Sequence, residues 1–142
     1  MSVDGALSLF LGTWKTRYTD VSRNAPIPIP IEATAAFHRE GDLLRYTAET
    51  VYPDGRTAFL ETSFRADGKP YPLSGSLVGD HVTFEQTSRH TFVATVQRNG
   101  VLAGSVSARI SPDGHTMTSR YEIFLPDGQS VTYRTVGDRQ AG

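Results

Sequence analysis

The stretch "FLGTWKTRYT" (Phe10–Thr19) decides the fold, because a short apolar run changes there into strand-like alternation. Its Trp14 is the only tryptophan of the chain and stands two residues after Gly12. Successive side chains of a strand point to opposite faces, so an inward Trp14 places Thr16 and Tyr18 on the inner face as well. The stretch therefore predicts a first strand that is anchored by a buried tryptophan.

Turn signals divide the rest of the chain into short runs. Asp-Gly or Asn-Gly pairs, which accept the positive φ angles of tight hairpins, stand at 54–55, 67–68, 99–100, 113–114 and 127–128. The runs between the turns are rich in Thr, Val, Tyr and Phe and alternate with a period of two, which is typical of strands. The predicted strands cover residues 12–19, 31–38, 43–52, 57–64, 81–87, 91–97, 101–110, 116–124 and 130–136. Only "VDGALSLFL" (3–11) favours a short helical turn.

This pattern predicts an all-β fold, a closed up-and-down antiparallel β-barrel of about 8–10 strands. Closure removes the exposed edges that so many strands would otherwise present. We expect the 142 residues, 1–142, to form this barrel as one domain. A barrel of this size encloses either packed side chains or one small ligand.

The opening stretch resembles the Gly-x-Trp signature of the calycins, the lipocalins and the fatty-acid-binding proteins. In that family the tryptophan closes the floor of the barrel, so the resemblance implies this role for Trp14. It also implies that a basic residue late in the last strand, Arg139 or Arg134, packs on the tryptophan ring.

Three later stretches resemble a group of small bacterial lipocalin-like proteins. They are "ADGKPYPLSG" (66–75), "SPDGHTMT" (111–118) and "LPDGQSVTYRTVGDRQ" (125–140). The segment "DVSRNAPIPIPIEATAAF" (20–37) departs from the pattern, because it is more apolar and richer in proline than the family leads us to expect.

Proline occupies every second position of "PIPIPI" (26–31), which makes this segment stiff and extended. One interpretation is a connector that packs over an end of the barrel. The other is an apolar lip, formed by Ile27, Ile29 and Ile31, at the mouth of a ligand cavity or against another chain.

Alternation along the strands assigns aromatic and small residues to the inner face. On the strand 101–110 the inner row is Leu102, Gly104, Val106 and Ala108. Small inward residues such as Ala48, Ala94 and Gly104 leave room for a cavity, whereas an ordinary filled core is the alternative. An apolar lining with a few hydroxyls is typical of a small-molecule pocket. We therefore expect an apolar or amphipathic ligand to contact Trp14, Tyr18, Tyr46, Ala48, Leu60, Phe64, Phe84, Phe92, Ala94, Met117, Tyr121 and Tyr133.

Two classes of function stay open. A carrier or sensor would only hold its ligand. The resemblance to lipocalin-like barrels of bacterial secondary metabolism implies a second class. This is a cyclase, which folds a polyketide or polyene substrate for ring formation and uses neither a metal nor a nucleophile. Its catalytic hydroxyl donors would be Tyr46 and Tyr121. A minor alternative is a heme-binding barrel, since the sequences of such barrels begin with a similar "FLGTW". In this case His90 would be the iron ligand.

The composition argues against several other classes. The formal net charge is −1, with no basic run, so we expect no nucleic-acid partner. The chain has no cysteine and its histidines lack metal-ligand spacing, so we expect no metal and no cofactor. No stretch approaches the ~20 apolar residues of a membrane span. Without the basic start of a signal peptide, we expect a cytoplasmic monomer or homodimer, or a secreted protein if a leader has been removed.

Overall fold

Ten antiparallel strands and one short 3₁₀ helix follow one another along the chain in a computed structural model, which describes residues 7–22 and 27–141. The helix, η2, spans Ser8–Phe10. The strands are β1 (Gly12–Thr19), β2 (Glu32–Glu40), β3 (Leu43–Val51), β4 (Thr57–Phe64), β5 (Tyr71–Pro72), β6 (His81–Ser88), β7 (Thr91–Arg98), β8 (Val101–Ile110), β9 (Thr116–Phe124) and β10 (Ser130–Arg139). The predicted all-β class and the short helical turn are confirmed, while residues 3–6 of the segment expected to form that turn lie outside the described residues.

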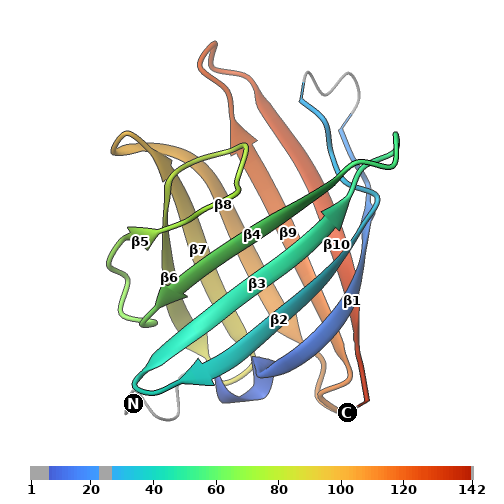
Figure 1. Ribbon diagram of the computed structural model, residues 1–142, viewed down its shortest axis with the longest axis vertical. Helices are drawn as coiled ribbons and strands as arrows, with labels where there is room; N and C mark the ends of the chain where they lie inside the picture. Colours follow the sequence, from blue (N-terminus) through green and yellow to red (C-terminus); the bar gives the residue numbers. More distant parts are fainter. Residues whose placement is uncertain (1–6, 23–26, 142) are drawn as a thin grey trace.

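The strands form one sheet in the order β4-β3-β2-β1-β10-β9-β8-β7-β6-β5. The first and last strands of the chain pair directly, from Trp14 opposite Arg139 to Thr19 opposite Arg134. In Figure 1, β1–β4 form the near wall and β6–β9 the far wall, and β10 joins the two walls. The result is the predicted up-and-down barrel.

The barrel closes at a narrow seam between β4 and the segment that follows β5. Two backbone hydrogen bonds join the seam: the Glu61 amide donates to the Ser74 carbonyl at 3.1 Å, and the Ser74 amide donates back at 3.0 Å. The other neighbouring pairs of strands share antiparallel ladders. The barrel is therefore nearly closed, and this seam is its weakest junction.

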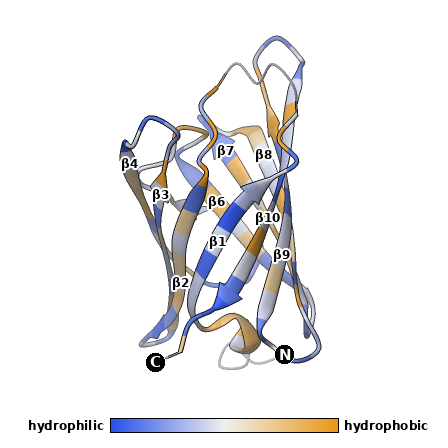
Figure 2. Cartoon of the chain, turned by 90° about the vertical axis from the view of Figure 1, so that its right-hand side faces the viewer, coloured by the Kyte–Doolittle hydropathy of each residue, from blue (hydrophilic) through white to orange (hydrophobic). Residues whose placement is uncertain are grey.

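Local sequence explains most of the strand bounds. Each predicted turn pair lies outside the regular strands, and its glycine has a positive φ, as tight turns of this kind require. Four of the five pairs lie in turns or bends, whereas Asp67 of the pair 67–68 forms an isolated bridge with Glu85. The sequence missed only β5, which is two residues long and includes Pro72, a residue that cannot donate to a ladder. The hydrophilic and hydrophobic residues alternate along the strands in Figure 2, while η2 at the bottom end is hydrophobic.

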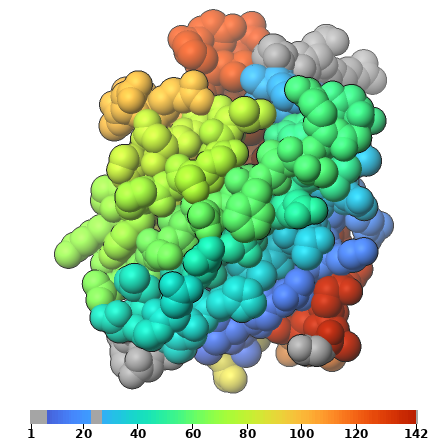
Figure 3. All heavy atoms as spheres, in the orientation of Figure 1, coloured from blue at the N-terminus to red at the C-terminus, as the bar shows by residue number. Residues whose placement is uncertain are grey.

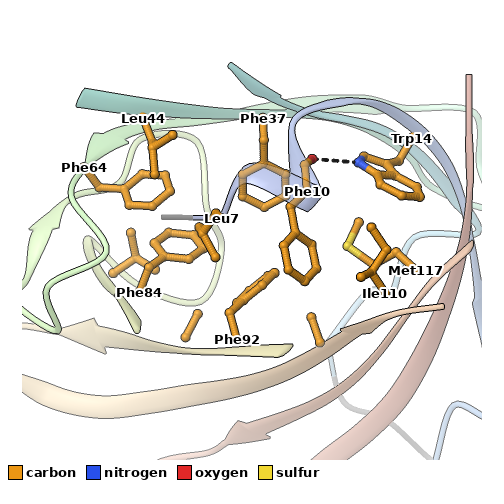
Figure 4. Close-up of a cluster of buried hydrophobic side chains, with 13 residues drawn as sticks. Leu7, Phe10, Trp14, Phe37, Leu44, Phe64, Phe84, Phe92, Ile110 and Met117 are labelled. Carbon is orange, nitrogen blue, oxygen red and sulfur yellow. Dashed lines mark hydrogen bonds between the residues drawn. The ribbon is translucent and has the colours of Figure 1, made fainter. Parts of the chain in front are cut away.

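Trp14 lies in the floor of the barrel and is fully buried. Its indole Nε1 donates a hydrogen bond to the Phe10 carbonyl at 3.0 Å, which ties β1 to η2 (Figure 4). Leu7 and Phe10 are fully buried beside it. The predicted burial of Trp14 is confirmed.

Arg139, rather than Arg134, packs on the tryptophan. Its guanidinium carbon lies 4.3 Å from the centroid of the Trp14 ring, and Arg134 is exposed on the outer face. The Arg139 side chain also donates to three backbone carbonyls, those of Leu9, Leu11 and Gly114, at 2.5–2.8 Å.

Gly12 lies directly beside this arginine. Its φ is +121°, and a Cβ at this position would lie only 2.9 Å from Nη1 of Arg139. The Gly-x-Trp spacing therefore leaves room for the arginine that covers the tryptophan.

Aromatic side chains fill the end of the barrel next to η2. Phe37 and Phe92 contact Phe10, with ring centroids 6.3 and 4.9 Å away, and Phe64 stacks on Phe84 at 3.9 Å. Figure 4 shows these rings converging from several strands around η2. This end of the barrel is therefore a filled core.

One inward assignment is wrong. Leu102 is 51 % exposed, although alternation placed it on the inner face with Gly104. A bulge explains the error. Val96 of β7 pairs with Gly104 of β8, but the next residue of β7, Gln97, pairs with Leu102, so β8 has one extra residue at this point. The extra residue changes the phase of the alternation at the start of β8.

Candidate ligand-binding site

A cavity of about 420 Å³ occupies the barrel beyond the aromatic floor. This volume is in the usual range of small-molecule sites. Every strand except β5 contributes to its lining, together with residues 27–30, Tyr52, Leu73 and residues 75–78. In Figure 3 the surface is hollowed near the top, between the segment that follows β5 and the start of β4.

Most of the predicted ligand-binding residues lie in the wall of this cavity. They are Tyr18, Tyr46, Ala48, Leu60, Phe84, Phe92, Ala94, Met117, Tyr121 and Tyr133. Trp14 and Phe64 point inward as predicted, but they do not line the cavity. Both are fully buried, and Phe64 stacks on Phe84, which does line the cavity.

Sequence reasoning missed two parts of the lining. The β2 residues Ala33, Ala35 and Phe37 face the cavity, and their alternation with Glu32 and Thr34 was available as a signal. The segment 73–78 contributes the other part, and it has no periodicity from which an inward orientation could be inferred.

The Ile-Pro segment lies at the cavity, as the lip interpretation expects. Residues 27–30 line it, and Ile27 and Ile29 belong to an apolar cluster with Tyr18 and Tyr121. Ile31 is half exposed and does not line the cavity. The prediction that three isoleucines form the lip is therefore wrong for Ile31. Pro26 lies outside the described residues.

Tyrosine rings supply much of the polar lining. Tyr121 stacks on Tyr133 with centroids 4.7 Å apart, Tyr18 lies 5.4 Å from Tyr133, and Tyr46 packs on Phe37 at 4.9 Å. Burial raises the pKa of Tyr18, Tyr46 and Tyr133 well above the usual value of a phenol, and it raises the pKa of Tyr121 to about 12. At neutral pH these phenols are uncharged and can donate hydrogen bonds.

Two threonine hydroxyls of the lining have no partner. The Oγ1 atoms of Thr16 and Thr62 are buried, and neither makes a hydrogen bond within the described part of the chain. Buried hydroxyls are ordinarily hydrogen-bonded, and an unpaired one carries a desolvation cost. Because the two oxygen atoms have essentially no accessible surface, these residues contribute to the cavity wall through the other atoms of their side chains.

Ionisable side chains are nearly excluded from the cavity. Over residues 7–22 and 27–141, Glu122 is the one Asp, Glu, Lys, Arg or His residue in the lining, and it alternates with the inward Tyr121 and Ile123. All the histidines lie in the described ranges and none lines the cavity; His90 sits in the turn between β6 and β7. A heme held by a histidine ligand therefore does not fit these residues.

The strand order, the tryptophan floor and the internal cavity define a lipocalin-like β-barrel. Solved structures share this architecture. The crystal structure of Rv2717c from M. tuberculosis matches with a TM-score of 0.69 and 18 % identity, over 99 % of each chain. Zebrafish ileal bile acid-binding protein complexed with cholic acid, a barrel of the calycin type, matches with a TM-score of 0.56 and 15 % identity, over 94 % of this chain and 100 % of the other.

A further match is the structure of EF1p2_mFAP2b bound to DFHBI, with a TM-score of 0.51 and 13 % identity, over 98 % of this chain and 100 % of the other. At these identities the likeness shows the fold alone. No family model and no curated protein matches the chain. Among the described residues no helix has the length and apolar character needed to cross a membrane.

Proposed function

We propose that the barrel binds an apolar or amphipathic small molecule in its cavity and acts as a carrier or sensor. The observation that carries this proposal is the 420 Å³ cavity, whose wall combines aromatic rings with tyrosine, serine and threonine side chains. A filled core would leave no such space. The structural neighbours described with cholic acid and with DFHBI support the proposal as examples of such barrels in complexes.

Substitutions that fill the cavity should abolish binding while the fold persists. We expect N-phenyl-1-naphthylamine, an uncharged fluorescent probe, to bind with micromolar or better affinity. Ala94→Trp, and separately Tyr121→Trp, should weaken binding at least tenfold, about 1.4 kcal/mol, because both positions line the cavity. Probe titration measures the affinity, and circular dichroism checks the fold.

The matched control is Val93→Trp. Val93 is the neighbour of Ala94 on β7 and alternates to the outer face, so its replacement should leave the affinity unchanged. Equal binding by wild type, Ala94→Trp and Tyr121→Trp would place the probe site elsewhere and contradict the proposal.

A cyclase is the second candidate, because several uncharged tyrosine side chains line one cavity. For this function Tyr46 and Tyr121 would be the catalytic donors, polarising a carbonyl while the wall holds the reacting carbons close together. Both residues line the same cavity, and both belong to its buried part.

Removal of one hydroxyl separates the two candidates. If the barrel is a cyclase, Tyr46→Phe or Tyr121→Phe should lower kcat by roughly tenfold or more, about 1.4 kcal/mol, with little change in substrate affinity. For a carrier the same change should alter only Kd. Mass spectrometry and chromatography of linear polyene or polyketide precursors, incubated with each variant, make the measurement.

Tyr71→Phe is the control for these variants, because its hydroxyl donates to exposed Asp67 outside the cavity. Recovery of unaltered precursors with wild-type protein would contradict the cyclase and leave the carrier.

A further inference from the structure

We infer that the cavity selects an uncharged ligand that carries hydroxyl, ether or carbonyl groups, and that it discriminates against ionised acids. This inference rests on the proposed binding function and names the chemical class of its ligand. It follows from what the inner wall offers and from what the wall lacks.

The wall lacks a counter-ion for an anion. Within the described ranges the lining includes no lysine, arginine or histidine. Arg45, which neighbours the inward Tyr46 on β3, forms ion pairs with Glu40 and Glu61 instead. Arg120 and Arg134, which neighbour Tyr121 and Tyr133, are exposed on the outer face.

An unpaired ion in such a space is costly. Transfer of a carboxylate from water into apolar surroundings is strongly unfavourable unless a positive group or several donors meet it. The same burial raises the pKa of the lining tyrosines, because it disfavours the phenolate. A bound carboxylate would experience the same penalty.

Apart from Glu122, the polar groups of the wall are uncharged. Thr62 lies directly opposite Tyr46 in the ladder between β3 and β4, so a threonine hydroxyl and a phenol occupy neighbouring inward positions. Further hydroxyl-bearing side chains of the lining are those of Tyr18, Tyr121, Tyr133 and Ser119. A hydroxyl both donates and accepts, so it suits a ligand hydroxyl or carbonyl, while the aromatic rings suit the apolar remainder.

A matched pair of probes tests the selection. N-phenyl-1-naphthylamine and 8-anilinonaphthalene-1-sulfonate share one aromatic skeleton, and the second adds a sulfonate that stays ionised. We expect the uncharged probe to bind wild-type protein at least tenfold more tightly than the sulfonate in fluorescence titrations at pH 7.

An internal cation should change this preference. Thr62→Lys places an ammonium group beside Tyr46, and we expect it to reduce the ratio of the two affinities at least fivefold. Ser63→Lys makes the same change in net charge on the exposed side of β4, so it should leave the ratio as in wild type. If Thr62→Lys does not fold, the comparison on wild-type protein decides by itself.

The outcomes separate the inference from the proposed function. Equal or tighter binding of the sulfonate would overturn the inference and leave the binding function standing. Failure of both probes to bind would overturn both. Preference for the uncharged probe, lost in Thr62→Lys and kept in Ser63→Lys, is the result expected.

Discussion

Replacement of Trp14 by alanine should lower the free energy of unfolding by about 3–5 kcal/mol, the usual cost of removing a large aromatic ring from a core. Trp14 is fully buried, donates its Nε1 proton to the Phe10 carbonyl and is covered by the Arg139 guanidinium. Alanine leaves a cavity in the floor, and the Phe10 carbonyl loses its indole donor. The end of the barrel that supports the ligand cavity is thereby weakened.

Urea unfolding followed by circular dichroism measures this loss, since Trp14 is the sole tryptophan and its fluorescence disappears with it. Phe59→Ala is the control, because that ring on β4 is 52 % exposed and its removal should change stability by less than about 1 kcal/mol. A similarly small loss for Trp14→Ala would contradict its role as the floor.

The fold was predictable because the local signals agree with one another. Asp-Gly and Asn-Gly pairs fix where the chain turns, and alternation between them fixes which side chains face inward. Leu102 shows the limit of this reasoning, since a bulge changes the phase without a marker in the sequence. Residues 73–78 show a second limit, because an irregular segment reaches the cavity without any period.

The site was harder to predict than the fold, because alternation gives the face of the sheet and not the height along the barrel. Trp14 and Phe64 point inward like Tyr18 and Tyr46, yet they lie at the filled end and do not meet the cavity. Whether a barrel is hollow depends on the summed volume of all inward side chains and of η2. Composition could not separate a hollow barrel from a filled one for this reason.

Gly75 is expected to be the most sensitive residue of the barrel seam. Its φ is +84°, and a Cβ there would lie 1.8 Å from the Phe59 carbonyl oxygen, so the chain approaches β4 too closely for any side chain. Ser74, the preceding residue, makes the two hydrogen bonds with Glu61 that join the seam.

Gly75→Ala should therefore destabilise the protein by roughly 2–5 kcal/mol, about 1–2 from the left-handed backbone and about 1–3 from the steric overlap. Gly55→Ala is the matched control, because Gly55 has a φ of +88° and a Cβ there would meet no atom within 4 Å. This control should show only the backbone part of the loss. Urea unfolding gives both values.

The seam also borders the segment 73–78, which contributes to the cavity wall, so the same two variants test its link to the ligand site. Gly75→Ala should weaken binding of N-phenyl-1-naphthylamine, because the displaced segment no longer completes the wall, whereas Gly55→Ala should not. The two glycines differ in the contact with Phe59, which only a side chain at position 75 would make. If both variants lose the same stability and both still bind the probe as wild type does, the seam does not close the barrel.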